Sequence, residues 1–246
     1  MGDIKRVKRS KEEAKISYNK MSKWYDLLVG HSEKRFRDVG LQKLNIQEGE
    51  KVLEIGFGTG HCILSLARSV GDTGKTYGLD ISEGMLRITT SRIEKAGLSE
   101  KVDLQCGDAL NLPYPEFYFD AVFTSFTLEL FDTPEIPIVL EQCKRVLKKG
   151  GRICVVAMSK EEKQGPMMKL YEWLHEKFPN YIDCRPIFVR QSLESAHLKI
   201  VNTTMMSFLG LDVEIVVANK TGEQKAKPEG ARGGRDKSRF LLARRK

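Results

Sequence analysis

The sequence of 246 residues lacks any apolar run of about 18 residues, the length that a membrane-spanning helix requires. Its first fifteen residues also lack the apolar stretch of a secretory signal. Arg6 stands where N-myristoylation requires Ser or Thr. We therefore expect a cytoplasmic protein, for which peripheral attachment is the only route to a membrane surface.

Cysteine is scarce and scattered. The five cysteines are odd in number and none of them are paired in CxxC spacing. This pattern is typical of a reducing compartment, and it argues against a disulfide framework and against a structural zinc site. We expect no bound metal.

The basic residues are concentrated at the two ends of the chain. The formal net charge is +8, of which residues 1–24 carry +5 and residues 220–246 carry +7, so the body between them is mildly acidic. The high overall charge is therefore weak evidence that the body binds a phosphate backbone. The basic ends themselves suit contact with RNA or with an anionic membrane surface.

Apolar runs of strand length alternate with helix-like segments. The runs cover 52–55, 75–79, 102–105, 121–125 and 152–158, the helical segments cover 60–70, 82–96 and 134–146, and two further strands are expected at 200–208 and 212–218. This alternation predicts an α/β fold with a parallel sheet that is covered on both faces. The Lys148–Gly151 run, with cations followed by glycines, is typical of the end of a helix.

The regions outside this repeat divide the chain. We expect an N-terminal helical cap at 1–45, a main domain at 46–219 and a substrate-cap insertion at 159–198 within it. Residues 220–246 are rich in Lys, Gly, Glu and Arg, which predicts a disordered basic tail.

The segment VLEIGFGTGH at 52–61 is a glycine-rich turn after a strand. It lacks GxxxxGK[ST], which excludes a P-loop, and His61 or Ile63 stands where a dinucleotide fingerprint requires its last glycine. What remains is an acid followed by three alternating glycines: Glu54, Gly56, Gly58 and Gly60. Either a cofactor cradle or a purely structural turn fits this pattern.

Acidic residues follow the next two strands. Asp80 can accept hydrogen bonds from ribose hydroxyls or cap the following helix, and Asp108 can accept from an adenine amino group or serve as a turn residue. Thr124–Phe126 end the fourth strand. Because ligands of open α/β sheets bind outside the carboxyl ends of the strands, these features predict one shared crevice.

The motifs EIGFGTG, GLDIS, GDALNLPYPEFYFDAV and RVLKKGGRI resemble those of class I S-adenosylmethionine-dependent methyltransferases over about residues 40–157. YNKMSKWYDLL and LPYPEFYFDAV resemble in particular the ubiquinone/menaquinone-biosynthesis methyltransferases. The chain departs from that family at His61, where the family carries Asp, and at Thr127–Leu130, where the family often reads Gly-Leu-Arg-Asn.

The resemblance implies a Rossmann-like class I methyltransferase fold, with a seven-stranded, mostly parallel sheet whose last strand is antiparallel. It implies S-adenosyl-L-methionine as the cofactor, with Tyr18 and Tyr25 covering it from the N-terminal side. The cofactor-binding residues that we expect are Tyr25, Glu54, Gly56, Phe57, Gly58, Gly60, Asp80, Ile81, Met85, Gly107, Asp108, Ala109, Thr124, Ser125 and Phe126.

No catalytic base stands out from the sequence. Glu129, His31, Tyr171 and His175 are candidates by position, although a solitary histidine on a helix is more often structural. Met167, Met168, Tyr171 and Trp173 recur at helical spacing, which fits core packing or a lining for an apolar or aromatic acceptor.

Three functions are therefore compared. The first is methyl transfer to a small, apolar or aromatic, quinone-like molecule by a monomer or homodimer. The second is methylation of RNA or protein with the help of the basic tail, whose Arg/Gly segment suits RNA. The third is a non-catalytic module of the same fold that binds a membrane surface or a partner.

Overall fold

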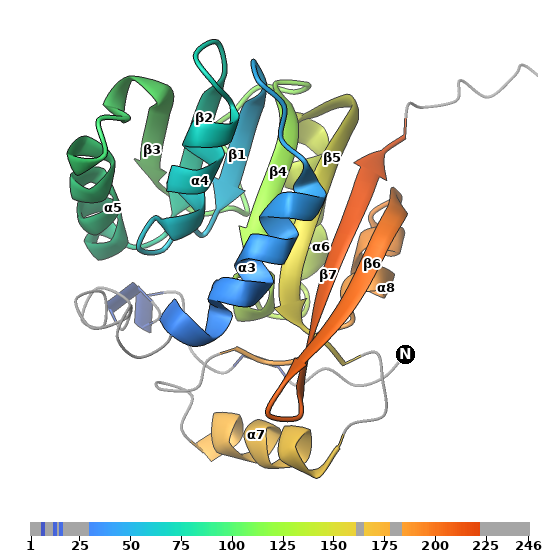
Figure 1. Ribbon diagram of the computed structural model, residues 1–246. Helices are drawn as coiled ribbons and strands as arrows, with labels where there is room; N and C mark the ends of the chain where they lie inside the picture. The colour runs from blue at the N-terminus through green and yellow to red at the C-terminus, as the bar shows by residue number, and fades with distance from the viewer. Residues whose placement is uncertain are drawn as a thin grey trace, which may run out of the picture.

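The computed structural model describes residues 6–7, 12–13, 15–16, 30–160, 165–177 and 184–221. A central sheet with helices on both of its faces forms this part of the chain (Figure 1). The expected α/β architecture is confirmed.

The sheet has seven strands in the order β3-β2-β1-β4-β5-β7-β6. Pairing is parallel from β3 to β5, and the last strand, β7, runs antiparallel to both β5 and β6, as expected. The strands are β1 (Lys51–Ile55), β2 (Lys75–Asp80), β3 (Val102–Cys106), β4 (Phe119–Ser125), β5 (Leu147–Met158), β6 (Leu198–Phe208) and β7 (Leu211–Lys220).

Helices α3 (Gly30–Leu44), α4 (His61–Ser69) and α5 (Glu83–Lys95) cover one face, and α6 (Ile136–Val146) and α8 (Val189–Ser195) cover the other (Figure 1). Two short 3₁₀ helices, η1 (Ser99–Lys101) and η2 (Leu128–Leu130), follow α5 and β4. Helix α7 (Pro166–Lys177) lies beyond the sheet, at the end toward which β1 and β4 point. No described helix combines the length and the apolar character needed to cross a membrane.

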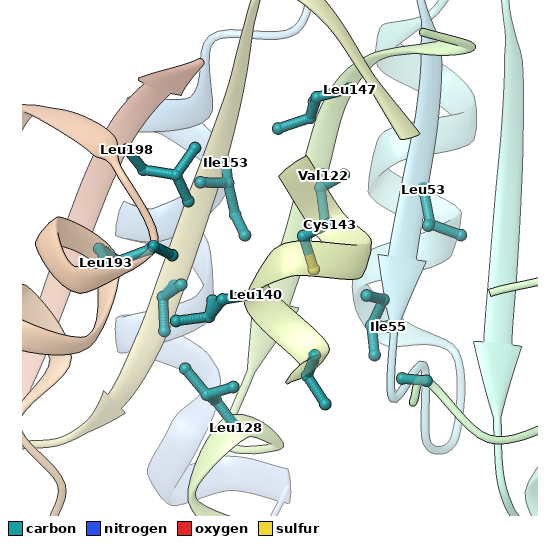
Figure 2. Packing of buried hydrophobic residues seen from close by; sticks show 14 of the residues in the cluster. Leu53, Ile55, Val122, Leu128, Leu140, Cys143, Leu147, Ile153, Leu193 and Leu198 are labelled. Atoms are coloured by element: carbon teal, nitrogen blue, oxygen red, sulfur yellow. The ribbon is translucent and has the colours of Figure 1, made fainter. Parts of the chain in front are cut away.

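Helix α6 shows why these residues form a helix on this face. Val139, Leu140 and Cys143 recur on one side of it and are buried against the sheet, where Val122 and Ile153 meet them (Figure 2). An apolar stripe of this period is what packs a helix onto a sheet. On the other face, Ser82 begins α5 as a cap, since its hydroxyl accepts a hydrogen bond from the Met85 amide at 3.2 Å.

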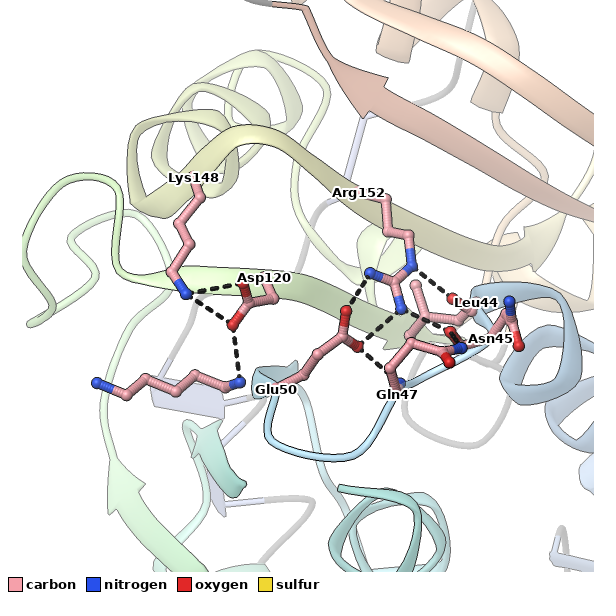
Figure 3. Close-up of polar contacts among 8 residues, drawn as sticks. Leu44, Asn45, Gln47, Glu50, Asp120, Lys148 and Arg152 are labelled. Carbon is pink, nitrogen blue, oxygen red and sulfur yellow. Dashed lines mark hydrogen bonds and ion pairs between the residues drawn. The ribbon is translucent and has the colours of Figure 1, made fainter. Parts of the chain in front are cut away.

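A polar network fastens the amino ends of the strands (Figure 3). The Arg152 guanidinium donates to the carbonyls of Leu44 and Asn45 and pairs with Glu50 at 2.8 Å. Asp120 accepts from the first amide of β1 and pairs with a lysine of β5. These contacts hold the α3–β1 connection at the end of the sheet opposite the carboxyl ends of the strands.

The expectation for Lys148–Gly151 needs a correction. Helix α6 ends at Val146 with Lys144 and Arg145 in its last turn, and the Lys-Lys-Gly-Gly run already belongs to β5. Gly150 has φ +76° and lies where the register between β4 and β5 shifts, between the pairs Phe119–Leu147 and Ala121–Arg152.

Candidate active site

A cavity of about 300 Å³ opens at the carboxyl ends of β1, β2, β3 and β4. This is the edge of a parallel sheet at which ligands of α/β proteins bind. One half of the cavity is lined by the glycine turn and the ends of β2 and β3, and the other by the segment after β4, by Val7 and by Cys184.

Backbone hydrogen bonds fix the glycine turn: the Gly56 amide donates to the Leu79 carbonyl at 2.8 Å and the Gly60 amide to the Phe57 carbonyl at 2.9 Å. Gly56 has φ +73°, and a Cβ added there would lie 2.2 Å from the Thr127 hydroxyl oxygen, so only glycine fits. Gly58 has φ +52° and lines the cavity, and a Cβ added there would meet nothing within 4 Å. The backbone at Gly58 is therefore directly accessible to a ligand in the cavity.

Asp80 ties this turn to the end of β2. One carboxylate oxygen accepts from the Gly58 amide and the other from the Ser82 amide, both at 2.9 Å. Burial raises the pKa of Asp80 to about 6, against the opposing effect of these backbone hydrogen bonds. Each carboxylate oxygen can accept a further hydrogen bond, so Asp80 can bind a ligand hydroxyl in addition to ordering the turn.

The end of β3 brings Asp108 and Ala109 to the same cavity. The Gly107 amide donates to the Asp80 carbonyl at 2.9 Å, which joins the two strand ends. Asp108 Oδ1 accepts from the Leu110 amide at 3.0 Å, so the turn role that the sequence left open is present. Asp108 also lines the cavity.

The other half of the cavity combines apolar side chains with two carboxylates, those of Asp132 and Glu135. Leu130 and Phe131 form its wall after β4, together with Phe126, Val7 and Cys184. No lysine, arginine or histidine of the described residues lines the cavity. This half therefore offers apolar surface to a ligand that carries no negative charge.

The N-terminal segment closes this half. Both Arg6 and the Val7 amide bind the carboxylate of Asp132, with an ion pair of 2.6 Å and a backbone hydrogen bond of 3.0 Å. These hydrogen bonds from the Arg6 side chain lower the pKa of Asp132 to about 2. Residues at the start of the chain thus form part of the cavity wall.

The structure places most of the expected cofactor-binding residues together. Ten of them line the cavity: Gly56, Gly58, Asp80, Ile81, Met85, Gly107, Asp108, Ala109, Ser125 and Phe126. Tyr25 and Tyr18 lie outside the described residues. The roles assigned to the ten in cofactor binding stay predictions, now with a common location.

Four expected cofactor-binding residues do not line the cavity. Phe57 packs against α4 and α5 in a hydrophobic cluster. Gly60 is the N-cap of α4 and Thr124 is buried near the end of β4, and neither lines the cavity. Glu54 is 2% exposed beneath the turn, and burial raises its pKa well above the usual range. Its Oε2 has no hydrogen-bond partner among the described residues.

Three of the four sequence-based candidates for a base have described side chains, and none of these three lines the cavity. Glu129 is completely buried and accepts a hydrogen bond from the Met158 amide at 3.2 Å. Tyr171 packs against the apolar cluster beneath α3, and neither it nor His175 lines the cavity. The side chain of His31 lies outside the described part.

The sequence left core packing and acceptor lining open for the apolar residues of α7. On α7, Met168 is buried in the core, whereas Met167 and Trp173 are about half exposed, and none of the three lines the cavity. Among the described residues no group of three or more His, Cys, Asp or Glu is placed to bind a metal ion.

Several cavity residues were missed from the sequence. Val7, Leu130, Phe131, Asp132, Glu135 and Cys184 line the cavity and were not expected to do so. The segment after β4 could have been included, because it follows a strand end at the crevice. Val7 and Cys184 carry no local signal, since only tertiary packing brings them there.

Known proteins are similar to the part of the chain that forms most of the cavity. A family model described as a methyltransferase domain matches residues 52–151, which include β1 to β4. The demethylmenaquinone methyltransferase of Oceanobacillus iheyensis is 29% identical over 74% of this chain and 85% of that protein. The ubiquinone/menaquinone biosynthesis C-methyltransferase UbiE of Paraburkholderia phytofirmans is 31% identical over 76% of this chain and 77% of that protein.

Solved structures share the fold. A SAM-dependent methyltransferase from Aquifex aeolicus superimposes with a TM-score of 0.59 at 24% identity, covering 87% of this chain and 100% of that chain. The [4+2]-cyclase SpnF superimposes with a TM-score of 0.72 at 19% identity, covering 87% of this chain and 97% of that chain. At these identities the likeness is one of fold, which alone does not determine the reaction.

Proposed function

The chain belongs to the class I S-adenosylmethionine-dependent methyltransferases, and we propose that it transfers a methyl group to a small, apolar or aromatic, quinone-like acceptor. The observation that carries this proposal is the two-part cavity, with an open glycine turn and Asp80 in one half and an apolar wall in the other. Two relatives that align with about three quarters of the chain are named as a demethylmenaquinone methyltransferase and a ubiquinone/menaquinone biosynthesis C-methyltransferase, which supports an acceptor of this class.

The first half of the cavity fits the cofactor. Gly58 exposes its backbone, and Asp80 retains lone pairs that can accept hydrogen bonds from ribose hydroxyls. The carboxylates of Asp80 and Asp108 also suit a ligand that carries positive charge. S-adenosylmethionine supplies an electrophilic methyl group on a sulfonium when it is bound.

The residues of this chain then have to orient an acceptor and exclude water. Leu130, Phe131 and Phe126 offer apolar surface against which a flat ring can pack. The Arg6–Asp132 pair and Val7 cover one side of this half, which limits the access of water. Correct orientation of this kind can supply on the order of 7–11 kcal/mol of a reaction barrier.

The charges of the cavity bear on the acceptor class. Its lining contains four carboxylates and, within the described residues, no cationic side chain. Asp132 is neutralised by Arg6 from outside the cavity. An anionic acceptor such as a phosphate ester would be repelled, so a neutral hydroquinone ring is favoured.

The balance of the reaction is simple for a ring carbon. The acceptor ring would form a carbon–carbon bond to the methyl group supplied by S-adenosylmethionine, and the electron pair of the broken carbon–sulfur bond would stay on sulfur. The ring proton is then lost to water or to a nearby carboxylate. An electron-rich hydroquinone carbon needs less help from a strong base than an alcohol does, which suits a cavity without a described histidine or lysine.

Methyl transfer from labelled S-adenosylmethionine tests the proposal. The full chain is incubated with a reduced short-chain demethylmenaquinone, with total cellular RNA and with total protein in parallel, and Asp80→Asn serves as the control. We expect label and one added methyl group on the quinone ring only. Label in RNA or protein, with none in the quinone, would overturn the acceptor class. Attachment of the basic ends to a membrane surface stays a prediction, as does a monomeric or homodimeric state.

A further inference from the structure

Arg185 lies directly behind the apolar wall of the cavity. It follows Cys184, which lines the cavity, and it is only 2% exposed. Its guanidinium donates through Nη2 to the Phe131 carbonyl at 2.5 Å and through Nη1 to the Thr133 hydroxyl at 3.2 Å. Phe131 is itself part of the cavity wall, so Arg185 binds the back of the surface that faces the acceptor.

Two acidic residues of the segment after β4, Asp132 and Glu129, interact electrostatically with Arg185. Burial lowers the pKa of Arg185, whereas the negative charges of Asp132 and Glu129 act to raise it. Glu129 is completely buried and holds the Met158 amide at 3.2 Å. Buried charges are tolerated only where partners of opposite sign and hydrogen bonds compensate them, so the position of this loop depends on the arginine.

The segment that carries Arg185 is itself fastened to the sheet. The Ile187 amide donates to the Met158 carbonyl at 2.9 Å, and the Lys160 amide donates to the Ile187 carbonyl at 3.0 Å. Arg190, three residues after Ile187, forms an ion pair of 2.7 Å with Glu214 of β7. Arg185 therefore projects from a fixed support onto the loop after β4.

We propose that Arg185 is a positioning residue for methyl transfer, holding the Leu130–Phe131 wall at the place that fits the acceptor. It lines neither half of the cavity and acts through the loop that it binds. The inference rests on the proposed function, because it assumes that the acceptor occupies this half. It concerns the second half of the cavity alone, so cofactor affinity should be almost independent of it.

The chain offers a matched control in Arg152 (Figure 3). Arg152 donates to the carbonyls of Leu44 and Asn45 and pairs with the Glu50 carboxylate, at the opposite end of the sheet, whereas Arg185 donates to one carbonyl and one hydroxyl. Arg185→Gln and Arg152→Gln thus remove similar contacts at different distances from the cavity. Arg185→Lys keeps the charge and one donor toward the loop.

The experiment combines three measurements on the full chain. These are KM and kcat with a reduced short-chain demethylmenaquinone, the Kd of S-adenosylhomocysteine by calorimetry, and hydrogen exchange of residues 127–133. For Arg185→Gln we expect a KM for the acceptor about tenfold higher, a lower kcat, faster exchange in that segment and a Kd within about twofold of wild type. Arg185→Lys should recover part of the loss, and Arg152→Gln should leave KM unchanged.

An Arg185→Gln protein with wild-type KM and wild-type exchange would overturn the proposal, as would equal effects of Arg185→Gln and Arg152→Gln. If Arg185→Gln does not fold, Arg185→Lys and Thr133→Ala, which removes a single acceptor, must show the smaller KM increase. If the wild-type enzyme does not methylate the quinone, the acceptor class is wrong. In that case exchange and cofactor affinity still decide the role of Arg185.

Discussion

The pKa of Asp80 leads to a quantitative prediction for cofactor affinity. Burial raises this pKa from 3.8 to about 6, and the carboxylate faces the cavity while holding the Gly58 amide. If the ionised form accepts the ribose hydroxyls, only the ionised fraction of the protein binds fully. That fraction is about nine tenths at pH 7 and about one tenth at pH 5.

The affinity for S-adenosylhomocysteine should therefore fall about tenfold between pH 8 and pH 5, with a midpoint near pH 6. Isothermal titration calorimetry at half-unit pH intervals measures this curve, and Asp80→Asn provides the matched control without a titrating group. In the variant we expect a weaker affinity at every pH and a flat profile. An affinity of the wild type that is constant from pH 5 to pH 8, or a variant that keeps the wild-type profile, would refute the reasoning.

The raised pKa of Asp80 also affects the stability of the cofactor-free protein. Because the folded pKa lies above the unfolded value, the folded state binds more protons than the unfolded state between pH 4 and pH 6. Asp80 therefore makes stability fall as pH rises through this window, by on the order of 3 kcal/mol in total. The difference in urea unfolding free energy between wild type and Asp80→Asn should change by about this amount, with the wild type relatively less stable at the higher pH. A difference that stays constant would contradict the raised pKa.

Three further predictions concern other parts of the fold. Gly58→Val should weaken S-adenosylhomocysteine binding at least tenfold, because the added side chain fills the cavity. Gly97→Ala, at a similar φ of +67° and remote from the cavity, should cost about 1 kcal/mol of stability and leave calorimetric binding unchanged. Equal binding losses in the two variants would contradict the cavity assignment. Leu140→Ala removes a fully buried side chain of α6 and should lower the unfolding free energy in urea by about 2–5 kcal/mol, and a loss below 1 kcal/mol would mean that α6 packs loosely. Arg6→Ala breaks a pair whose arginine is 67% exposed, so the unfolding free energy in urea should hardly change. The KM for the quinone should rise, because the cavity wall next to Asp132 is opened. An unchanged KM would remove Arg6 from the site.

The cofactor half of the site could be predicted from the sequence because local patterns determine it. The glycine turn and Asp80 each follow directly after an apolar strand, and parallel strands bring their carboxyl ends to one edge. Placing a residue after a strand was therefore enough to place it near the cavity. Of the four expected residues that do not line the cavity, Phe57 and Glu54 have side chains that are buried within the fold.

The acceptor half could not be predicted, because it is assembled from distant segments. Arg6 meets Asp132 across 126 positions of sequence, and Arg185 meets Phe131 across 54. No periodicity or spacing in the sequence connects such pairs, since only tertiary packing brings the two segments of each pair together. The position of Glu129 after β4 makes it a candidate base in the sequence. Its side chain is buried because the residue lies in a 3₁₀ turn that the sequence does not indicate.

A crystal structure of the protein with S-adenosylhomocysteine tests the central claim most directly. We expect the ligand in the cavity, with its ribose on the Asp80 carboxylate and its amino-acid end on the backbone at Gly58, leaving the space beside Phe131 open for an acceptor. A ligand bound elsewhere, or one that leaves Asp80 without contact, would contradict this account.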